Sequence, residues 1–347
     1  MPSLAERPPT GGRCVALPEP VGPRTQHLFA ALCGSPESEP VGGDFGPSDD
    51  PLGDLDLQLA LYACYELHYA SLEGVDERWE WSPSLLGFRA ELETELERAV
   101  EELVPKADGD PECVSEELQR LVADDDGPPL SRFLETRGTG EQMLEHVVHR
   151  SAYQLKEADP HSWAIPRLSA APKAALLEVQ FDEYGGGRAA DMHSVLFAGT
   201  MAALRLDPTY GAYLDRLPGV TLATVNLLSW FGLHRRLRGA LVGHLAAFEM
   251  TSSIPNRRYG NALRRLGYGE EATRFYDEHV EADAVHEAIA AWDLAGGLAR
   301  EEPALAGDIL FGARALLALE ARWGGHLLAC WERGETSLRA PLDLPAS

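Results

Sequence analysis

The sequence is poor in basic residues, with 30 Lys and Arg against 55 Asp and Glu among 347 residues. The resulting net charge of −25 argues against nucleic acid as a partner, because a phosphate backbone is bound by clustered basic side chains. The same charge argues against an anionic membrane surface. No apolar run approaches the ~20 residues that a membrane span requires, and the N-terminal stretch has no apolar segment of a secretory signal. We therefore predict a cytoplasmic protein.

Cysteine is also scarce, and the five cysteines are scattered without a C-x-x-C pair. A disulfide framework and a zinc-thiolate site are therefore not expected. The sequence has no G-x-S-x-G nucleophile elbow and no phosphate-binding loop of the G-x-x-x-x-G-K-[ST] type. The glycines at 185–187 lack the preceding strand of a dinucleotide-binding fold. Any metal in this chain would have oxygen and nitrogen ligands.

Strand patterns are nearly absent, and apolar residues recur at helical spacing instead. Between Phe88 and Val104, for example, Leu92, Leu96 and Val100 follow one another at steps of four. We predict an all-α protein of roughly ten helices. The main expected helices cover residues 56–68, 88–104, 112–126, 140–157, 173–182, 188–206, 222–231, 234–250, 256–266, 270–295 and 304–333.

The segment from Glu278 to His286 carries the most specific pattern. His279, Asp283 and His286 stand at positions i, i+4 and i+7, so an uninterrupted helix presents all three on one face. Two imidazoles and a carboxylate that converge are a ligand set that iron accepts. The alternative is a solvated acidic face that happens to carry histidines.

Further candidate ligands lie upstream. Glu183 and His193 are ten residues apart, about 80° out of register on an ideal helix, and glycines 185–187 separate them. These glycines accommodate either a π-bulge in a continuous helix or a plain loop. Glu249 lies in an apolar segment, where a carboxylate is ion-paired, protonated or metal-bound. Glu157 ends a predicted helix, where surface exposure is the default.

Together these residues offer three histidines and three or four carboxylates from several helices. One iron with two histidines and a carboxylate needs fewer ligands, whereas six or seven suit two metals bridged by a carboxylate. Glu249 is the first choice for the bridge, since it alone represents its helix. The two Glu-x-x-His motifs of ferritin-like sites are absent, so the bundle is of another kind.

The residues resemble the heme-oxygenase-like diiron oxidases and oxygenases, also called iron-containing redox enzymes. The resemblance rests on Glu183-x9-His193, on Glu249 and on His279-x3-Asp283-x2-His286, and Glu157 matches an extra carboxylate of some members. It implies a heme-oxygenase-like helical bundle, two Fe(II) ions per chain, O2 as co-substrate and a small-molecule substrate. The metal ligands it implies are Glu157, Glu183, His193, Glu249, His279, Asp283 and His286. A manganese–iron or dimanganese centre fits the same ligand types.

The resemblance covers about residues 140–335, which we take as the diiron core. Residues 1–54 are rich in Pro and Gly and are predicted to form an irregular arm that buries little, with one short helix near 21–32. Residues 55–139 are expected to form an accessory helical region, and 336–347 a tail. Reactions of this family include N-oxygenation of amines, which we prefer for this chain, and oxidative cleavage, decarboxylation or desaturation.

Several alternatives stay open. Arg235 and Arg238 belong to the densest basic cluster and could clamp a substrate carboxylate, or pair with surface acids instead. A heme enzyme, a cofactorless oxidase on the same fold and a non-catalytic helical scaffold are the rival functions. A heme site would have no use for buried Glu249 and Asp283. An external electron donor and a homodimer are compatible with the sequence, which fixes neither.

Overall fold

A computed structural model describes residues 14–37, 41–43 and 45–342, with residues 281–285 described as backbone only. Within these ranges the single element of β-structure is a bridge between Val15 and Leu72. The predicted all-α fold is confirmed. In chain order the α-helices are α1 (Pro23–Leu32), α2 (Leu55–Glu66), α3 (Pro83–Leu103), α4 (Val114–Ala123), α5 (Leu130–Thr136), α6 (Gly140–Gln154), α7 (Ala170–Glu183), α8 (His193–Ala203), α9 (Gly219–Leu233), α10 (Arg238–Arg265), α11 (Glu270–Ala288), α12 (Gly296–Glu301) and α13 (Ala306–Glu332).

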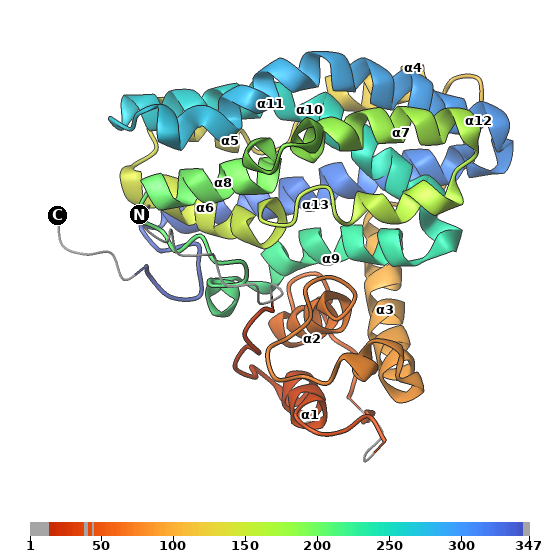
Figure 1. Cartoon of the computed structure of the whole chain (residues 1–347), viewed down its shortest axis with the longest axis vertical. Coiled ribbons are helices and arrows are strands. Elements are labelled where there is room, and N and C mark those ends of the chain that lie inside the picture. The colour runs from red at the N-terminus through yellow and green to blue at the C-terminus, as the bar shows by residue number, and fades with distance from the viewer. Residues whose placement is uncertain (1–13, 38–40, 44, 343–347) are drawn as a thin grey trace, which may run out of the picture.

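The helices from α4 onward form one bundle, and the long helix α10 packs against both α11 and α13 (Figure 1). Two glycines allow α10 and α13 to cross with their backbones in contact. A Cβ at Gly243 would lie 1.8 Å from the carbonyl oxygen of Ile309, and one at Gly312 would lie 1.9 Å from that of Ala240. Any larger residue at either position would push these two helices apart.

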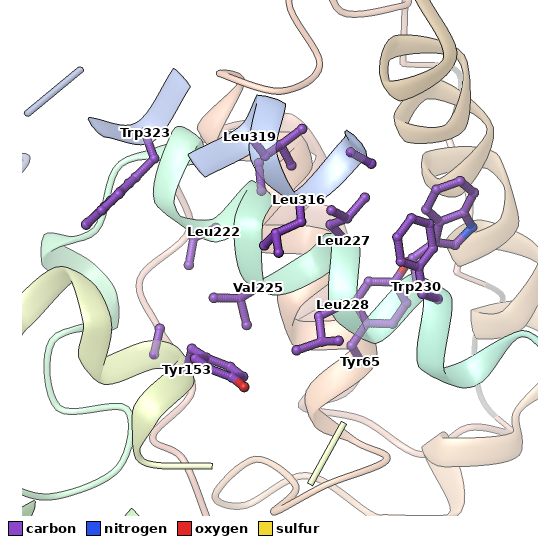
Figure 2. Close-up of a cluster of buried hydrophobic side chains, with 14 of the residues drawn as sticks. Tyr65, Tyr153, Leu222, Val225, Leu227, Leu228, Trp230, Leu316, Leu319 and Trp323 are labelled. Carbon is purple, nitrogen blue, oxygen red and sulfur yellow. The ribbon is translucent and has the colours of Figure 1, made fainter. Parts of the chain in front are cut away.

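Helix α9 is buried along nearly its whole length because it is covered from two directions. Its side chains, among them Leu227 and Leu228, lie between Leu316 of α13 and Tyr65 of α2 (Figure 2). A helix that is apolar all round is stable in water only when neighbours cover every face. In the described part of the chain, no helix combines the length and the apolar character needed to cross a membrane.

Helices α1, α2 and α3 form a smaller lobe beneath the bundle, joined to it where α2 packs on α9 (Figure 1). The expectation that residues 1–54 bury little is wrong for the described residues, since Leu28 and Leu32 of α1 are fully buried. Helix α2 is apolar on several faces and requires this cover. Asp56 of α2 fixes α1 in place by accepting hydrogen bonds from the backbone N–H groups of Arg24 and Thr25, at 2.8 and 2.9 Å.

Two further features differ from the sequence-based expectation. Helices α4 and α5 lie against α10 and α13, so the region 55–139 is divided between the small lobe and the bundle (Figure 1). The predicted break between residues 250 and 256 is also wrong, because α10 continues through Pro255. Just before the proline, Thr251 and Ser252 donate hydrogen bonds to the carbonyls of Ala247 and Glu249 of the same helix.

Candidate metal centre

Buried histidine and glutamate side chains from distant parts of the chain converge inside the bundle. They form two groups, in each of which one ligand atom per residue lies within 4.8 Å of all the others. The first group consists of Glu157, Glu183, His193 and His279. The second group consists of Glu183, Glu249 and His286. Glu183 belongs to both groups, so they could hold two neighbouring ions with one carboxylate in common. The sequence favoured Glu249 as the bridging ligand, whereas in the structure Glu183 is the residue that belongs to both groups.

Glu183 ends α7 and His193 begins α8, so both residues stand at helix ends. The residues between them form two short 3₁₀ turns, and the plain loop is therefore the correct interpretation of the three glycines. Gly185 has a positive φ of 70°, and a Cβ there would lie 2.6 Å from the backbone nitrogen of Met192. Only glycine fits this tight turn, which brings Nδ1 of His193 to 2.9 Å from Oε2 of Glu183.

Glu157 follows the end of α6 and is only 5% exposed, in contrast to the default expected from its position in the sequence. Ala158, the next residue, has a left-handed φ of 75°. On the other side of Glu157, the ammonium group of Lys156 donates to the buried carboxylate of Glu66 at 3.2 Å. With its NH2 group turned toward the site, the Gln154 amide donates to both oxygens of Glu157, at 2.7 and 3.1 Å. These contacts hold a carboxylate in the interior.

The remaining residues come from α10 and α11. Glu249 projects from α10, and His279 and His286 project from α11, where they are seven residues and therefore about 10 Å apart along the axis. This separation explains why each histidine belongs to a different group. Nε2 of His279 lies 3.5 Å from Oε1 of Glu157, and Nδ1 of His286 lies 3.5 Å from Oε2 of Glu249.

Hydrogen bonds indicate which nitrogen of each α11 histidine faces its group of ligand atoms. Nδ1 of His279 lies 2.8 Å from the carbonyl oxygen of Phe275, which can only accept, so Nδ1 carries the proton and Nε2 presents a lone pair to the first group. Nε2 of His286 lies 3.1 Å from Oδ2 of Asp182, which leaves Nδ1 for the second group. Histidines that bind metals are oriented by acceptors of this kind.

The electrostatics of the two groups favour charged side chains. Burial alone would raise the pKa of Glu183, but His193, His279 and His286 outweigh burial and lower this pKa to about 2. Burial likewise lowers the pKa of His286, but Glu249 and Asp182 overcome this and raise it to about 9. Glu183 is thus held ionised beside imidazoles, whereas burial raises the pKa of Glu157, and a cation that binds here displaces protons from these side chains.

The donor set fits metal ions better than it fits hydrogen bonding alone. Although Nδ1 of His193 lies 2.9 Å from Glu183, this nitrogen and Nδ1 of His286 make no well-aligned hydrogen bond with any described residue. Two ligands at right angles, each at ~2.1 Å from one ion, would lie about 3 Å apart without pointing at each other. Imidazole and carboxylate donors suit iron, manganese and zinc.

Aromatic and neutral groups surround the two positions. Tyr153, Phe248 and His161 line a small cavity between the groups. His161 and His244 are buried with ring nitrogens 3.4 Å apart, and burial lowers the pKa of His161 to about 4, so it is neutral near pH 7. A larger cavity of about 360 Å³ adjoins the centre at His279, Phe248 and Ser252. The centre thus has an uncharged wall and space beside it for a small molecule.

Some predicted residues are not placed at the centre. The side chain of Asp283 lies outside the description, although α11 includes the residue. Arg238 forms an ion pair with Glu302, and Arg235 is exposed. Within the described part of the chain, neither arginine lines the cavity beside the centre, so the expected substrate clamp is not formed there. Sequence reasoning missed Asp182, and its position directly before Glu183 was the available signal.

Comparison with known proteins agrees with this arrangement. The profile of the family described as iron-containing redox enzymes matches residues 144–321, just over half of the chain. The crystal structure of a CADD-like protein of unknown function from Nostoc punctiforme matches with a TM-score of 0.50 and 17% identity, over 62% of this chain and 96% of that one. At this identity the match shows a shared fold. No curated protein matches the sequence.

Proposed function

The chain belongs to the family of iron-containing redox enzymes, and we propose that it is a non-heme diiron oxygenase or oxidase that acts on a small molecule. The observation that carries this proposal is the position of Glu183 in both groups of buried ligand atoms. Two metal positions that share a carboxylate are typical of carboxylate-rich diiron sites in helical bundles. A heme enzyme would need one proximal histidine and would leave the buried glutamates without a role.

In this proposal each ion has its own histidine ligands. Glu157, His193 and His279 would hold the first ion, Glu249 and His286 would hold the second, and Glu183, which belongs to both groups, would be available to each. We propose Asp283 as a further ligand from its spacing in the sequence alone. Iron bound at these positions would supply the electrons that reduce O2 and would oxidise the substrate.

The protein's own contribution is to orient ligands and to exclude water. Asp182 and the carbonyl of Phe275 set the tautomers of His286 and His279. Tyr153 and Phe248 cover the centre with an apolar wall, which protects a reactive oxidant from water. An external electron donor is a proposed partner for reactions that consume more electrons than the substrate provides.

The test is an anaerobic Fe(II) titration followed by mixing with O2. We expect uptake of two irons per chain and rapid consumption of O2. His279→Ala should lose the first ion and Glu249→Ala the second, each with loss of O2 consumption and retention of helical circular dichroism. Glu178→Gln on the exposed face of α7 is the matched control and should behave like the unaltered protein. Two irons and full O2 consumption in either ligand variant would refute the proposal.

Among oxidations by O2, N-oxygenation of an amine is the reaction we propose to assay first. Oxidative decarboxylation and desaturation are the next candidates. All of these reactions need a substrate positioned beside the first ion, where the 360 Å³ cavity meets His279.

A further inference from the structure

The 360 Å³ cavity has a composition that selects for a class of substrate. It extends from Phe248 and His279 at the metal centre to Leu130 and Arg258 at its other end. Phe248 and Arg258 are ten residues apart on α10, so this wall runs for roughly 15 Å. Its volume lies within the range of ligand pockets, about 300–1,000 Å³. A small molecule that enters here reaches the first metal position.

Aromatic rings make up much of the wall. Phe197, Phe248 and Phe275 lie at the end near the centre, and Trp323 of α13 also lines the cavity. Aromatic side chains bind flat, apolar molecules through large contact areas and preferred ring geometries. The wall therefore suits a ring system better than a flexible polar chain.

The cations in the wall are already paired. Arg150 makes two hydrogen bonds to Glu320, at 2.9 and 2.6 Å, and its guanidinium carbon lies 3.9 Å from the centre of the Trp323 ring. Arg258 donates to Ser131 at 3.2 Å and lies 3.9 Å from Glu135. A buried anionic substrate would need an unpaired cation to offset its loss of hydration. The described wall offers none.

Two buried polar groups of this wall lack a partner. The hydroxyl of Tyr276 and Nδ1 of His146 make no hydrogen bond to any residue that the structure describes. Burial and the neighbouring Tyr259 raise the pKa of Tyr276, so its hydroxyl keeps a proton to donate. An unsatisfied buried hydroxyl is unfavourable, and a bound acceptor would satisfy it. Tyr276 stands one helical turn before His279 on α11.

We propose that this cavity binds the substrate of the metal centre as an aromatic molecule that is not an anion and has one hydrogen-bond acceptor. The ring system lies against the aromatic wall, the reacting end lies at His279, and the acceptor receives a hydrogen bond from Tyr276 within one helical turn of the reacting end. Tyr276 is thus a specificity residue. The inference rests on the proposed diiron function only for the statement that the reacting end lies at His279. Which molecules the cavity binds can be measured without any catalytic reaction.

The test is calorimetric binding of three probes of similar size to the anaerobic, Fe(II)-loaded protein and to the iron-free protein. The probes are 2-acetylnaphthalene, which carries a neutral acceptor, 2-isopropylnaphthalene, which lacks it, and 2-naphthoate, which is anionic. We expect 2-acetylnaphthalene to bind about two- to tenfold more tightly than 2-isopropylnaphthalene, as one net hydrogen bond provides. Tyr276→Phe should abolish this difference by weakening only the acetyl probe.

Two further variants make the result specific. Leu317→Trp places a large side chain in the cavity wall and should weaken both neutral probes. Tyr213→Phe, which removes a hydroxyl that accepts a hydrogen bond from Asp207 outside the cavity, should leave all three affinities unchanged.

The possible failures are distinguishable. Absence of probe binding to protein that holds two irons would overturn the cavity proposal and leave the diiron function intact. Tightest binding of 2-naphthoate, or an unchanged preference in Tyr276→Phe, would overturn the proposed substrate class. Failure to take up iron, with the probe preference retained, would overturn the diiron function while supporting the binding site.

Discussion

Asp182 is predicted to control the affinity of the second metal position without being a ligand. Its carboxylate lies 3.1 Å from Nε2 of His286, and its side chain is 54% exposed. Asp182→Asn keeps the size of the side chain and an acceptor oxygen but removes the charge. Because the residue is half exposed, we expect folding stability to stay within about 0.5 kcal/mol of the unaltered protein.

The magnitude follows from the role of such acceptors. Loss of a carboxylate behind a metal-binding histidine typically lowers metal affinity 10–100-fold, which corresponds to about 1.4–2.7 kcal/mol. Exposure of Asp182 to solvent screens its charge and places the expected effect near tenfold. The substitution also lowers the pKa of His286, which stands at about 9 with Asp182 and Glu249 present. At neutral pH, protons then compete less with the metal ion for His286, and this offsets part of the loss of metal affinity. The loss of metal affinity should therefore be larger at pH 8.5, where protons compete little in either protein, than at pH 7.

The assay is titration with Co(II), followed by its visible absorption, in competition with a chelator at both pH values. Glu178→Gln removes one charge from the same helix, one turn earlier, and is the matched control. We expect the first ion to bind equally to both variants and the second ion to bind more weakly to Asp182→Asn. Equal affinity for the second ion in the two variants would refute the role assigned to Asp182.

Three further perturbations have clear expected outcomes. Gly185→Ala places a Cβ 2.6 Å from the backbone nitrogen of Met192 at a residue with a positive φ. Thermal unfolding should show a loss of stability of about 2 kcal/mol or more, and iron titration should show a lower affinity for the first ion. Unchanged stability and affinity would contradict the role given to this turn. Lys156→Met leaves the carboxylate of Glu66 buried without its cation and should cost about 3–5 kcal/mol in urea unfolding, and a loss below 1 kcal/mol would show that the pair is not needed. Burial lowers the pKa of His161 to about 4, so between pH 6.5 and pH 4 the unfolded chain binds more protons than the folded one. The free energy of unfolding should therefore fall by about 3 kcal/mol for this residue as the pH falls from about 6.5 to 4. In urea unfolding, His161→Gln should show a weaker dependence of stability on pH in that window, and an identical dependence would contradict the account.

The helical fold could be predicted because apolar periodicity is local information. Helices such as α3 and α13 repeat apolar residues along one face, and the structure places them close to the predicted ranges. The continuation of α10 through Pro255 could not be predicted in this way. Proline normally ends a helix, and here packing of α10 on α11 and α13 maintains the helix. The burial of α1 was missed for a related reason. Helix α1 is buried because it covers apolar faces of α2, and such a contact between separate helices is not visible in local periodicity.

For the candidate site, sequence spacing identified the residues that the structure brings together, but not how they divide into two groups. The division depends on the turn at Gly185, which sets Glu183 between the two α11 histidines. The place of Glu183 in both groups and the inward position of Glu157 arise from backbone geometry at helix ends. Periodicity carries no information about such geometry. Asp182 was missed because an acid next to a candidate ligand is ordinarily solvated.

The central claim is that two irons lie side by side and share Glu183. The most direct measurement is an anomalous difference map at the iron edge, from crystals grown anaerobically with Fe(II). We predict two peaks, one among Glu157, His193 and His279 and one between Glu249 and His286, with Glu183 contacting both. A single peak, or iron located away from Glu183, would contradict the account.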